Sequence, residues 1–195
     1  MSQKIILFYK FTPVNEADEA RKWQTVLAAE RGLNGRIIVS DHGINGTLGG
    51  DEEAIQDYIE QMNNYKHADF SDIEYKWSDG GYEDFPKLSV KLRKELVTLD
   101  PEEEFDVFDQ GTPLRPEDWH EFMQNNPGVT VLDARNNYES NIGKFKGAVT
   151  PNIDTFKEIK PYLEKLDKNK PLITYCTGDI RCEYLSAYMK HKGFS

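Results

Sequence analysis

The chain alternates between short apolar runs and longer segments whose apolar residues recur at helical spacing. Residues 4–11, read as K-I-I-L-F-Y-K-F, are typical of a buried strand. Asn15 is expected to cap the helix that follows, in which Ala20, Trp23 and Leu27 share one face. The first structural unit of the chain is therefore predicted to be a strand followed by an amphipathic helix.

The same pattern is repeated over the next part of the chain. Residues 36–40 and 44–48 are predicted strands joined by a short turn, and a second helix is predicted to start at Asp51. Residues 73–77 resume a strand, which gives the order βαββαβ. Two helices on one face of an antiparallel sheet in this order predict an α+β ferredoxin-like, acylphosphatase-like domain.

Residues 85–97 alternate between apolar and polar positions and are predicted to form a strand. Its polar face carries Lys87, Ser89, Lys91 and Arg93. Residues on one face of a strand lie roughly 6.6 Å apart, close to the interval between phosphates on a nucleic-acid strand. Two interpretations remain open, namely an RNA contact and an edge strand that lysines protect against aggregation.

A charged, proline-containing break at residues 100–104 marks the expected domain boundary. We expect an N-terminal domain over residues 1–100, a linker over 101–115 and a second domain over 116–195. In that domain a helix from Pro116, strands at residues 129–133 and 172–175 and a helix over 155–166 alternate, so it is predicted to be α/β.

Cys176 follows the predicted strand at residues 172–175, and a helix is predicted after the turn Thr177-Gly178-Asp179. The N–H groups at the start of a helix favour an anion, and a thiolate is one. We therefore expect the helix terminus and Arg181 to lower the pKa of Cys176 and to make it nucleophilic. The alternative is a buried cysteine with a structural role.

The two cysteines and four histidines of the 195-residue chain have no spacing typical of a disulfide framework or a metal site, so no bound metal is expected. There is no long apolar segment and no signal peptide, which predicts a cytoplasmic protein without a membrane anchor.

The net charge of −10 opposes RNA binding, but residues 106–195 carry 12 basic and 13 acidic side chains. RNA contacts must therefore come from local basic clusters or from parts outside this chain.

The loop C-T-G-D-I-R-C-E at residues 176–183 resembles the C-T-G-G-I-R-C-E signature of rhodanese-domain tRNA uridine hydroxylases. Four residues separate Cys176 from Arg181, as in rhodaneses, whereas cysteine-dependent phosphatases have five. The run G-I-N-G-T at residues 43–47 and the L-D-A-R run at 132–135 are also similar to this family. Asp179 departs from the signature, and its carboxylate would oppose a thiolate.

The resemblance implies an α/β rhodanese-like second domain, which ends here before its last strand and helix, so we expect a chain truncated at its C-terminus. It implies an oxidoreductase that hydroxylates the wobble uridine of tRNA at C5, with molecular oxygen as co-substrate and the anticodon region as partner. Neither a protein partner nor a cofactor is implied, and no flavin or dinucleotide fingerprint is visible. The implied catalytic residues are Cys176 and Arg181, in a loop that also holds Thr177, Gly178, Asp179, Ile180 and Cys182. The candidate RNA-binding residues are Lys87, Lys91, Arg93, His42 and Asn45.

Two other functions remain open at this point. The same loop could form a persulfide on Cys176 and act as a sulfurtransferase, or Asp179 could silence it and leave a binding module. Asp133 and Glu139 are expected to tie loops together, and Arg135 is the second candidate after Arg181 to reach the cysteine loop.

Overall fold

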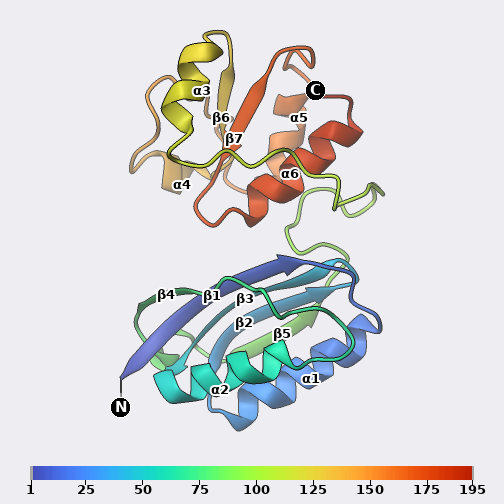
Figure 1. Cartoon of the computed structure of the whole chain (residues 1–195), viewed down its shortest axis with the longest axis vertical. Coiled ribbons are helices and arrows are strands. Elements are labelled where there is room, and N and C mark those ends of the chain that lie inside the picture. The colour runs from blue at the N-terminus through green and yellow to red at the C-terminus, as the bar shows by residue number, and fades with distance from the viewer. Residues whose placement is uncertain (1, 195) are drawn as a thin grey trace. The chain divides into compact units, whose positions relative to one another are not determined.

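Residues 2–194 are described by the computed structural model, and they separate into one unit that ends at Leu96 and a second that begins at Val97 (Figure 1). The segment expected as a linker, residues 101–115, lies in the second unit. There the ring of Phe105 packs edge-on against Tyr184 and Tyr188 of helix α6 (Ile180–His191). This segment is therefore packed onto the second unit through aromatic contacts.

The first unit is built on a five-stranded sheet with the order β4-β1-β3-β2-β5. Its strands are β1 (Gln3–Phe11), β2 (Asn34–Ser40), β3 (Gly43–Asp51), β4 (Lys76–Asp79) and β5 (Leu88–Leu92). All neighbours are antiparallel except β2 and β5, which are parallel. Helices α1 (Ala17–Glu30) and α2 (Glu52–Asn63) cover one face (Figure 1), and a short 3-10 helix, η1 (Tyr82–Asp84), precedes β5. The predicted ferredoxin-like, acylphosphatase-like fold is confirmed.

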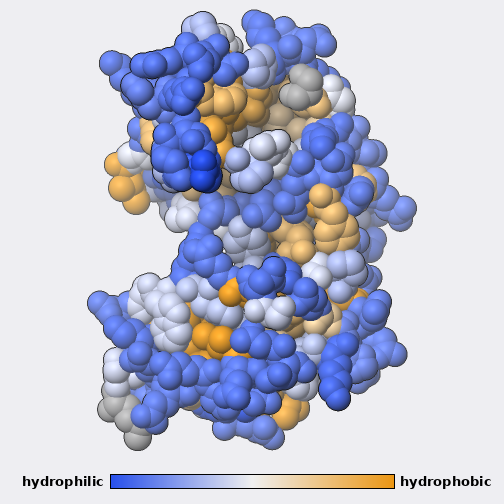
Figure 2. Space-filling model, in the orientation of Figure 1, coloured by the Kyte–Doolittle hydropathy of each residue, from blue (hydrophilic) through white to orange (hydrophobic). Residues whose placement is uncertain are grey.

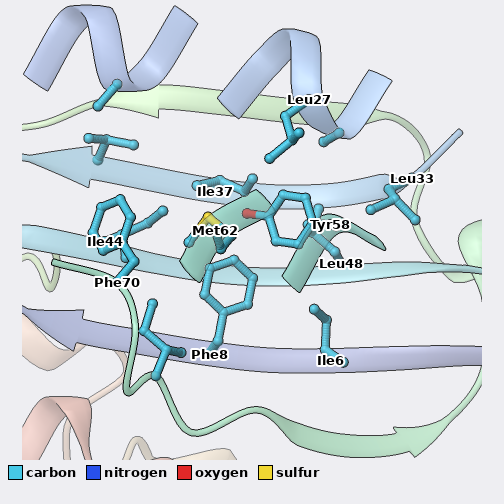
Figure 3. Packing of buried hydrophobic residues seen from close by; sticks show 14 of the residues in the cluster. Ile6, Phe8, Leu27, Leu33, Ile37, Ile44, Leu48, Tyr58, Met62 and Phe70 are labelled. Carbon is cyan, nitrogen blue, oxygen red and sulfur yellow. The ribbon is translucent and has the colours of Figure 1, made fainter. Parts of the chain in front are cut away.

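The core of this unit lies between the sheet and the two helices, where Phe8, Tyr58 and Met62 pack together (Figure 3). Gly46 is needed here because a Cβ atom at this position would lie 2.4 Å from the ring of Phe8. The ladder between β1 and β3 is continuous from Gln3 to Phe11, so the G-I-N-G-T run forms a regular strand without a bulge. Gly46 of this run thus makes room for the ring of Phe8 in the core.

Several element boundaries in this unit differ from the predictions, and three of the differences have a structural reason. Helix α1 begins at Ala17 because Glu16, in a left-handed conformation with φ 57°, precedes it in place of Asn15. The strand expected at residues 73–77 is shifted to β4, and Ile73 is buried in the core instead. The strand expected over 85–97 is limited to β5, which lies at the sheet edge and pairs only with β2.

The second unit contains a parallel strand pair, β6 (Thr130–Asp133) and β7 (Leu172–Tyr175), with Val149 bridged to Leu132 beside it. Its helices are α3 (Trp119–Asn125), α4 (Asn137–Ser140), the 3-10 helix η2 (Phe156–Ile159), α5 (Lys160–Leu163) and α6. The helix expected over 155–166 is divided into η2 and α5, with Pro161 in the first turn of α5, where its missing N–H costs nothing. The predicted α/β alternation is confirmed.

Helix α6 ends at His191, and two residues later Gly193 has φ +87°, with the Phe194 N–H donating to the Met189 carbonyl at 3.0 Å. Among residues 2–194, no helix is long and apolar enough to cross a membrane. Most of the visible surface is hydrophilic, and hydrophobic residues reach it in a few places (Figure 2).

Candidate active site

Cys176 lies directly after β7, in the loop that leads into α6 (Figure 1). A hydrogen bond from the Cys182 thiol lowers the pKa of Cys176 to about 6, against the opposing effect of burial. The backbone N–H groups of Gly178 and Cys182 and the charge of Arg181 lower the pKa further. This thiol is therefore more readily ionised, and more nucleophilic, than an ordinary cysteine.

Cys182 was expected in this loop, but its hydrogen bond to Cys176 was not predicted from the sequence. It lies in the first turn of α6, and its hydrogen bond to Cys176, together with burial, raises its pKa well above the ordinary value. One thiol thus keeps its proton and donates it in a hydrogen bond to the other, which is the anion. The spacing of six residues places both thiols at one helix end, but only the folded loop shows that one serves the other.

Arg181 is held beside this loop by Glu139 of α4. Its Nη1 and Nη2 donate to the two carboxylate oxygens at 2.7 and 2.6 Å. The hydroxyl of Thr177 donates to the same carboxylate at 2.6 Å. These hydrogen bonds, that from Arg181 first, lower the pKa of Glu139 to about 2, although burial opposes them. The carboxylate therefore ties both the loop and its arginine to α4.

The position of Glu139 is fixed by the start of α4. Asn136 occupies the N-cap position with an extended backbone, and its N–H donates to Glu139 Oε2 at 3.2 Å. An Asn followed three residues later by a Glu is the sequence signature of such a capping box. This pattern in the sequence indicates that Glu139 folds back towards the start of α4. The sequence does not indicate that Glu139 pairs with Arg181, because the two residues are 42 positions apart.

Arg135, the second candidate for contact with the cysteine loop, binds Asp133 and the Gly143 carbonyl instead. Its guanidinium donates to both oxygens of the fully buried Asp133, at 2.8 and 2.7 Å, and to the Gly143 carbonyl at 2.6 Å. Tyr175 also donates to Asp133, at 2.6 Å. Burial raises the pKa of Asp133, but these hydrogen bonds outweigh it and leave the pKa lowered. As expected, Asp133 joins the strand ends to the following loop.

Asp179 adopts φ 66° and ψ −40° at the N-cap of α6, without a side-chain capping bond. This is the left-handed region in which glycine is unstrained. Asp179 thus has a positive φ at the position where the family signature has glycine. Its charge raises the pKa of Cys182.

The five candidate RNA-binding residues all lie in the first unit. Lys91 is on edge strand β5 with Lys87 and Arg93 at its two ends, Asn45 is on β3, and His42 is in the turn between β2 and β3. The pairing of Ile38 with both Asn45 and Lys91 places these two side chains in one row across the sheet, on the face opposite α1 and α2. The fold thus brings two separate sequence candidates onto one surface.

Across the described residues, His, Cys, Asp and Glu form no group suited to a metal ion.

Comparison with known proteins gives two domain families in succession. Residues 3–96 match the family described as UPF0176 acylphosphatase like domain, and residues 116–195 match the rhodanese-like domain. The two matched ranges lie in the two units of the structure. The α/β second unit is thus a rhodanese-like domain, as the cysteine loop indicated.

Curated relatives match almost the whole chain. A protein of Corynebacterium diphtheriae named tRNA uridine(34) hydroxylase is 45% identical over 98% of this chain and 64% of its own length. Proteins of the same name from an Arthrobacter species and from Rhodococcus jostii are 44% and 43% identical, again over 98% of this chain, and are covered over 68% and 70% of their lengths. The chain thus spans about two thirds of these relatives. Since the identity extends through both domains, the chain belongs to the tRNA uridine(34) hydroxylase family.

Proposed function

We propose that this chain hydroxylates the wobble uridine of tRNA at C5, with Cys176 as the nucleophile and molecular oxygen as co-substrate. The observation that carries the proposal is the geometry of the loop, in which Arg181 is held by two hydrogen bonds to Glu139 and the pKa of Cys176 is lowered to about 6. The names of the relatives support the choice of tRNA and of uridine. The cytoplasm, where tRNA is modified, is the corresponding location.

The role of Cys176 follows from its charge. A thiolate that adds to C6 of the uracil ring forms an S–C6 bond, and the electron pair of the C5–C6 double bond moves towards C5 and O4. C5 then becomes electron-rich and bonds to one oxygen atom of molecular oxygen, while a two-electron donor such as a thiol reduces the other oxygen atom to water. Loss of the C5 proton and of the thiolate from C6 restores the C5–C6 double bond. Arg181 is placed to stabilise negative charge during this addition, and the loop N–H groups hold the sulfur in position.

Binding of the anticodon region requires cations, because phosphate contacts dominate RNA affinity. We infer that Lys87, Lys91 and Arg93 contact the phosphate backbone and that Asn45 and His42 lie beside them. Lys87, Lys91 and Arg93 are exposed, and Asn45 shares the row of Lys91. Replacing the three basic residues by Ala should weaken tRNA binding and make it less dependent on salt.

The test of the activity uses tRNA from a bacterial strain that lacks its own enzyme of this family. The wild-type chain should restore 5-hydroxyuridine, measured by nucleoside mass spectrometry, and Cys176→Ser should not, because a hydroxyl is far harder to ionise. Full activity of Cys176→Ser would overturn the role of the thiolate. Efficient sulfur transfer from thiosulfate to cyanide without 5-hydroxyuridine would instead identify a sulfurtransferase.

A further inference from the structure

The segment that follows Glu139 exposes large apolar side chains close to the cysteine loop. Tyr138, Ile142 and Phe145 are 67%, 89% and 50% exposed, and the whole of residues 141–147 is exposed. Lys144 and Lys146 flank Phe145. We call these five residues, Tyr138, Ile142, Lys144, Phe145 and Lys146, the stacking surface. Exposed apolar side chains concentrated in one short segment often mark an interaction site.

The stacking surface is held next to the reactive loop by contacts at both of its ends. Tyr138 directly precedes Glu139, whose carboxylate binds both Thr177 and Arg181. The N–H of Phe145 donates to the hydroxyl of Tyr175, the residue before Cys176, at 3.3 Å, and the two rings meet edge-on at 4.7 Å. Figure 1 accordingly shows α4 beside the loop between β7 and α6.

Phe145 is also preorganised. Its ring stacks on Trp119 with a centroid distance of 5.0 Å and an angle of 24° between the planes. Trp119 and Tyr175 thus fix the orientation of the ring while half of its surface stays exposed. A ring held in this way loses little conformational entropy when a flat ligand stacks on it.

The charge of the surface indicates which partner it fits. Between residues 136 and 149 the only acidic residue is Glu139, and that carboxylate is paired with Arg181. Lys144 and Lys146 therefore give this segment a local positive charge in a chain of net charge −10. Aromatic rings interleaved with cations suit single-stranded nucleic acid, because bases stack on the rings and phosphates pair with the lysines.

We propose that the stacking surface binds the unpaired nucleotides that adjoin the target uridine, with bases on Tyr138 and Phe145 and phosphates at Lys144 and Lys146. This inference rests on the proposed function, since it places the flanking nucleotides beside the loop of Cys176. It assigns a role in substrate binding to residues that lie in the rhodanese-like unit, outside the cysteine loop. A second copy of this acidic chain would also offer carboxylates to the lysines, so self-association is one of the outcomes that the test distinguishes.

The experiment measures binding of a fluorescein-labelled RNA stem–loop with uridine in its loop, by fluorescence anisotropy, to the full chain carrying Cys176→Ser. Tyr138→Ala and Phe145→Leu should each weaken binding roughly tenfold, because stacking on one ring is lost. Tyr82→Ala, which removes a partly exposed tyrosine of the first unit, is the matched control and should change nothing. Tyr138 has two thirds of its surface in solvent, so its replacement tests the surface even if Phe145→Leu disturbs packing.

The lysines are tested through the salt dependence of binding. Lys144→Ala/Lys146→Ala should reduce the slope of log K against log salt by roughly 1.4, the value for two phosphate contacts to a single strand. Lys165→Ala/Lys170→Ala, a pair of exposed lysines elsewhere in the second unit, is the control and should keep the wild-type slope.

Three outcomes would overturn the inference. Tyr138→Ala and Phe145→Leu could bind like Tyr82→Ala, or a continuous duplex could bind as tightly as the stem–loop. Self-association that Ile142→Ser abolishes, with RNA affinity unchanged, would assign the surface to a second copy. By contrast, stacking-dependent RNA binding by a wild-type chain that forms no 5-hydroxyuridine would overturn the proposed function and leave the binding surface in place.

Discussion

Glu139 and Arg181 form a two-pronged ion pair, in which the guanidinium donates at 2.7 Å to one carboxylate oxygen and at 2.6 Å to the other. Both side chains are largely shielded from solvent, with 14% and 18% of their surface exposed. A planar guanidinium held by two parallel hydrogen bonds has one orientation, so its position relative to Cys176 is fixed before substrate arrives.

Glu139→Gln should therefore impair the reaction although Glu139 is not proposed to touch the substrate. The amide would present an N–H group to the guanidinium, and Arg181 would lose its fixed orientation. Because small misplacements of a catalytic group are costly, we expect 5-hydroxyuridine formation to fall by roughly ten- to a hundredfold. Arg181→Lys should show a similar loss, since an ammonium cannot make the paired contact.

Glu164→Gln is the matched control, because Glu164 is an exposed glutamate of the same unit. It should retain wild-type activity and stability. If Glu139→Gln were as active as Glu164→Gln, the ion pair would have no part in positioning Arg181.

The same carboxylate predicts a pH dependence of stability. The pKa of Glu139 is lowered to about 2 in the folded chain, so the unfolded chain binds a proton first as the pH falls. The stabilisation from the pair is fully present above about pH 4.5 and is lost progressively towards pH 2, and it amounts to roughly 3 kcal/mol. Urea unfolding between pH 7 and pH 3 should show a smaller loss of unfolding free energy for Glu139→Gln than for the wild type. Parallel curves for the two chains would contradict the assignment.

Cys182 should control the ionisation of Cys176. Cys182→Ala removes the hydrogen-bond donor that contributes most to the lowered pKa, so the pKa of Cys176 should rise by roughly one to two pH units. Cys182→Ser keeps a donor at the same place and should give a smaller rise. The measurement is the pH dependence of alkylation at Cys176. Equal values in wild type and Cys182→Ala would show that the loop N–H groups and Arg181 suffice.

Asp179→Gly separates two effects of this residue. Glycine relieves the left-handed backbone at φ 66°, which should raise the free energy of unfolding by roughly 1 kcal/mol. Removal of the carboxylate should also lower the pKa of Cys176, because a nearby negative charge favours the neutral thiol. Asp179→Asn removes the charge and keeps a side chain, so it should reproduce the pKa change and gain less stability. A higher pKa of Cys176 in both variants would mean that the carboxylate supports the thiolate.

The sequence by itself determined the elements that carry the chemistry. The apolar run at residues 172–175 became β7 with the predicted ends, since a short β-branched and aromatic run followed by a glycine turn has few alternatives. The βαββαβ order likewise determined the first fold, because local periodicity separates helix from strand. The helix terminus that lowers the pKa of Cys176 is also a local feature of the chain.

Element ends were less predictable where distant contacts decide them. The alternating pattern over residues 85–97 extends beyond β5, but only Leu88 to Leu92 find partners on β2. A strand ends where its ladder ends, and local alternation does not encode the length of the neighbouring strand. The same holds for β4, whose register is set by Lys4 to Leu7 of β1.

Only the tertiary structure decided which groups meet at the reactive cysteine. Glu139 reaches Arg181 across 42 residues because α4, started by its own capping box, packs beside the loop between β7 and α6. Phe145 meets Tyr175 across 30 residues for the same reason. Sequence periodicity describes the face that an element turns inward, whereas the partner on the other side depends on how the elements pack, and that is settled by the whole set of contacts in the unit.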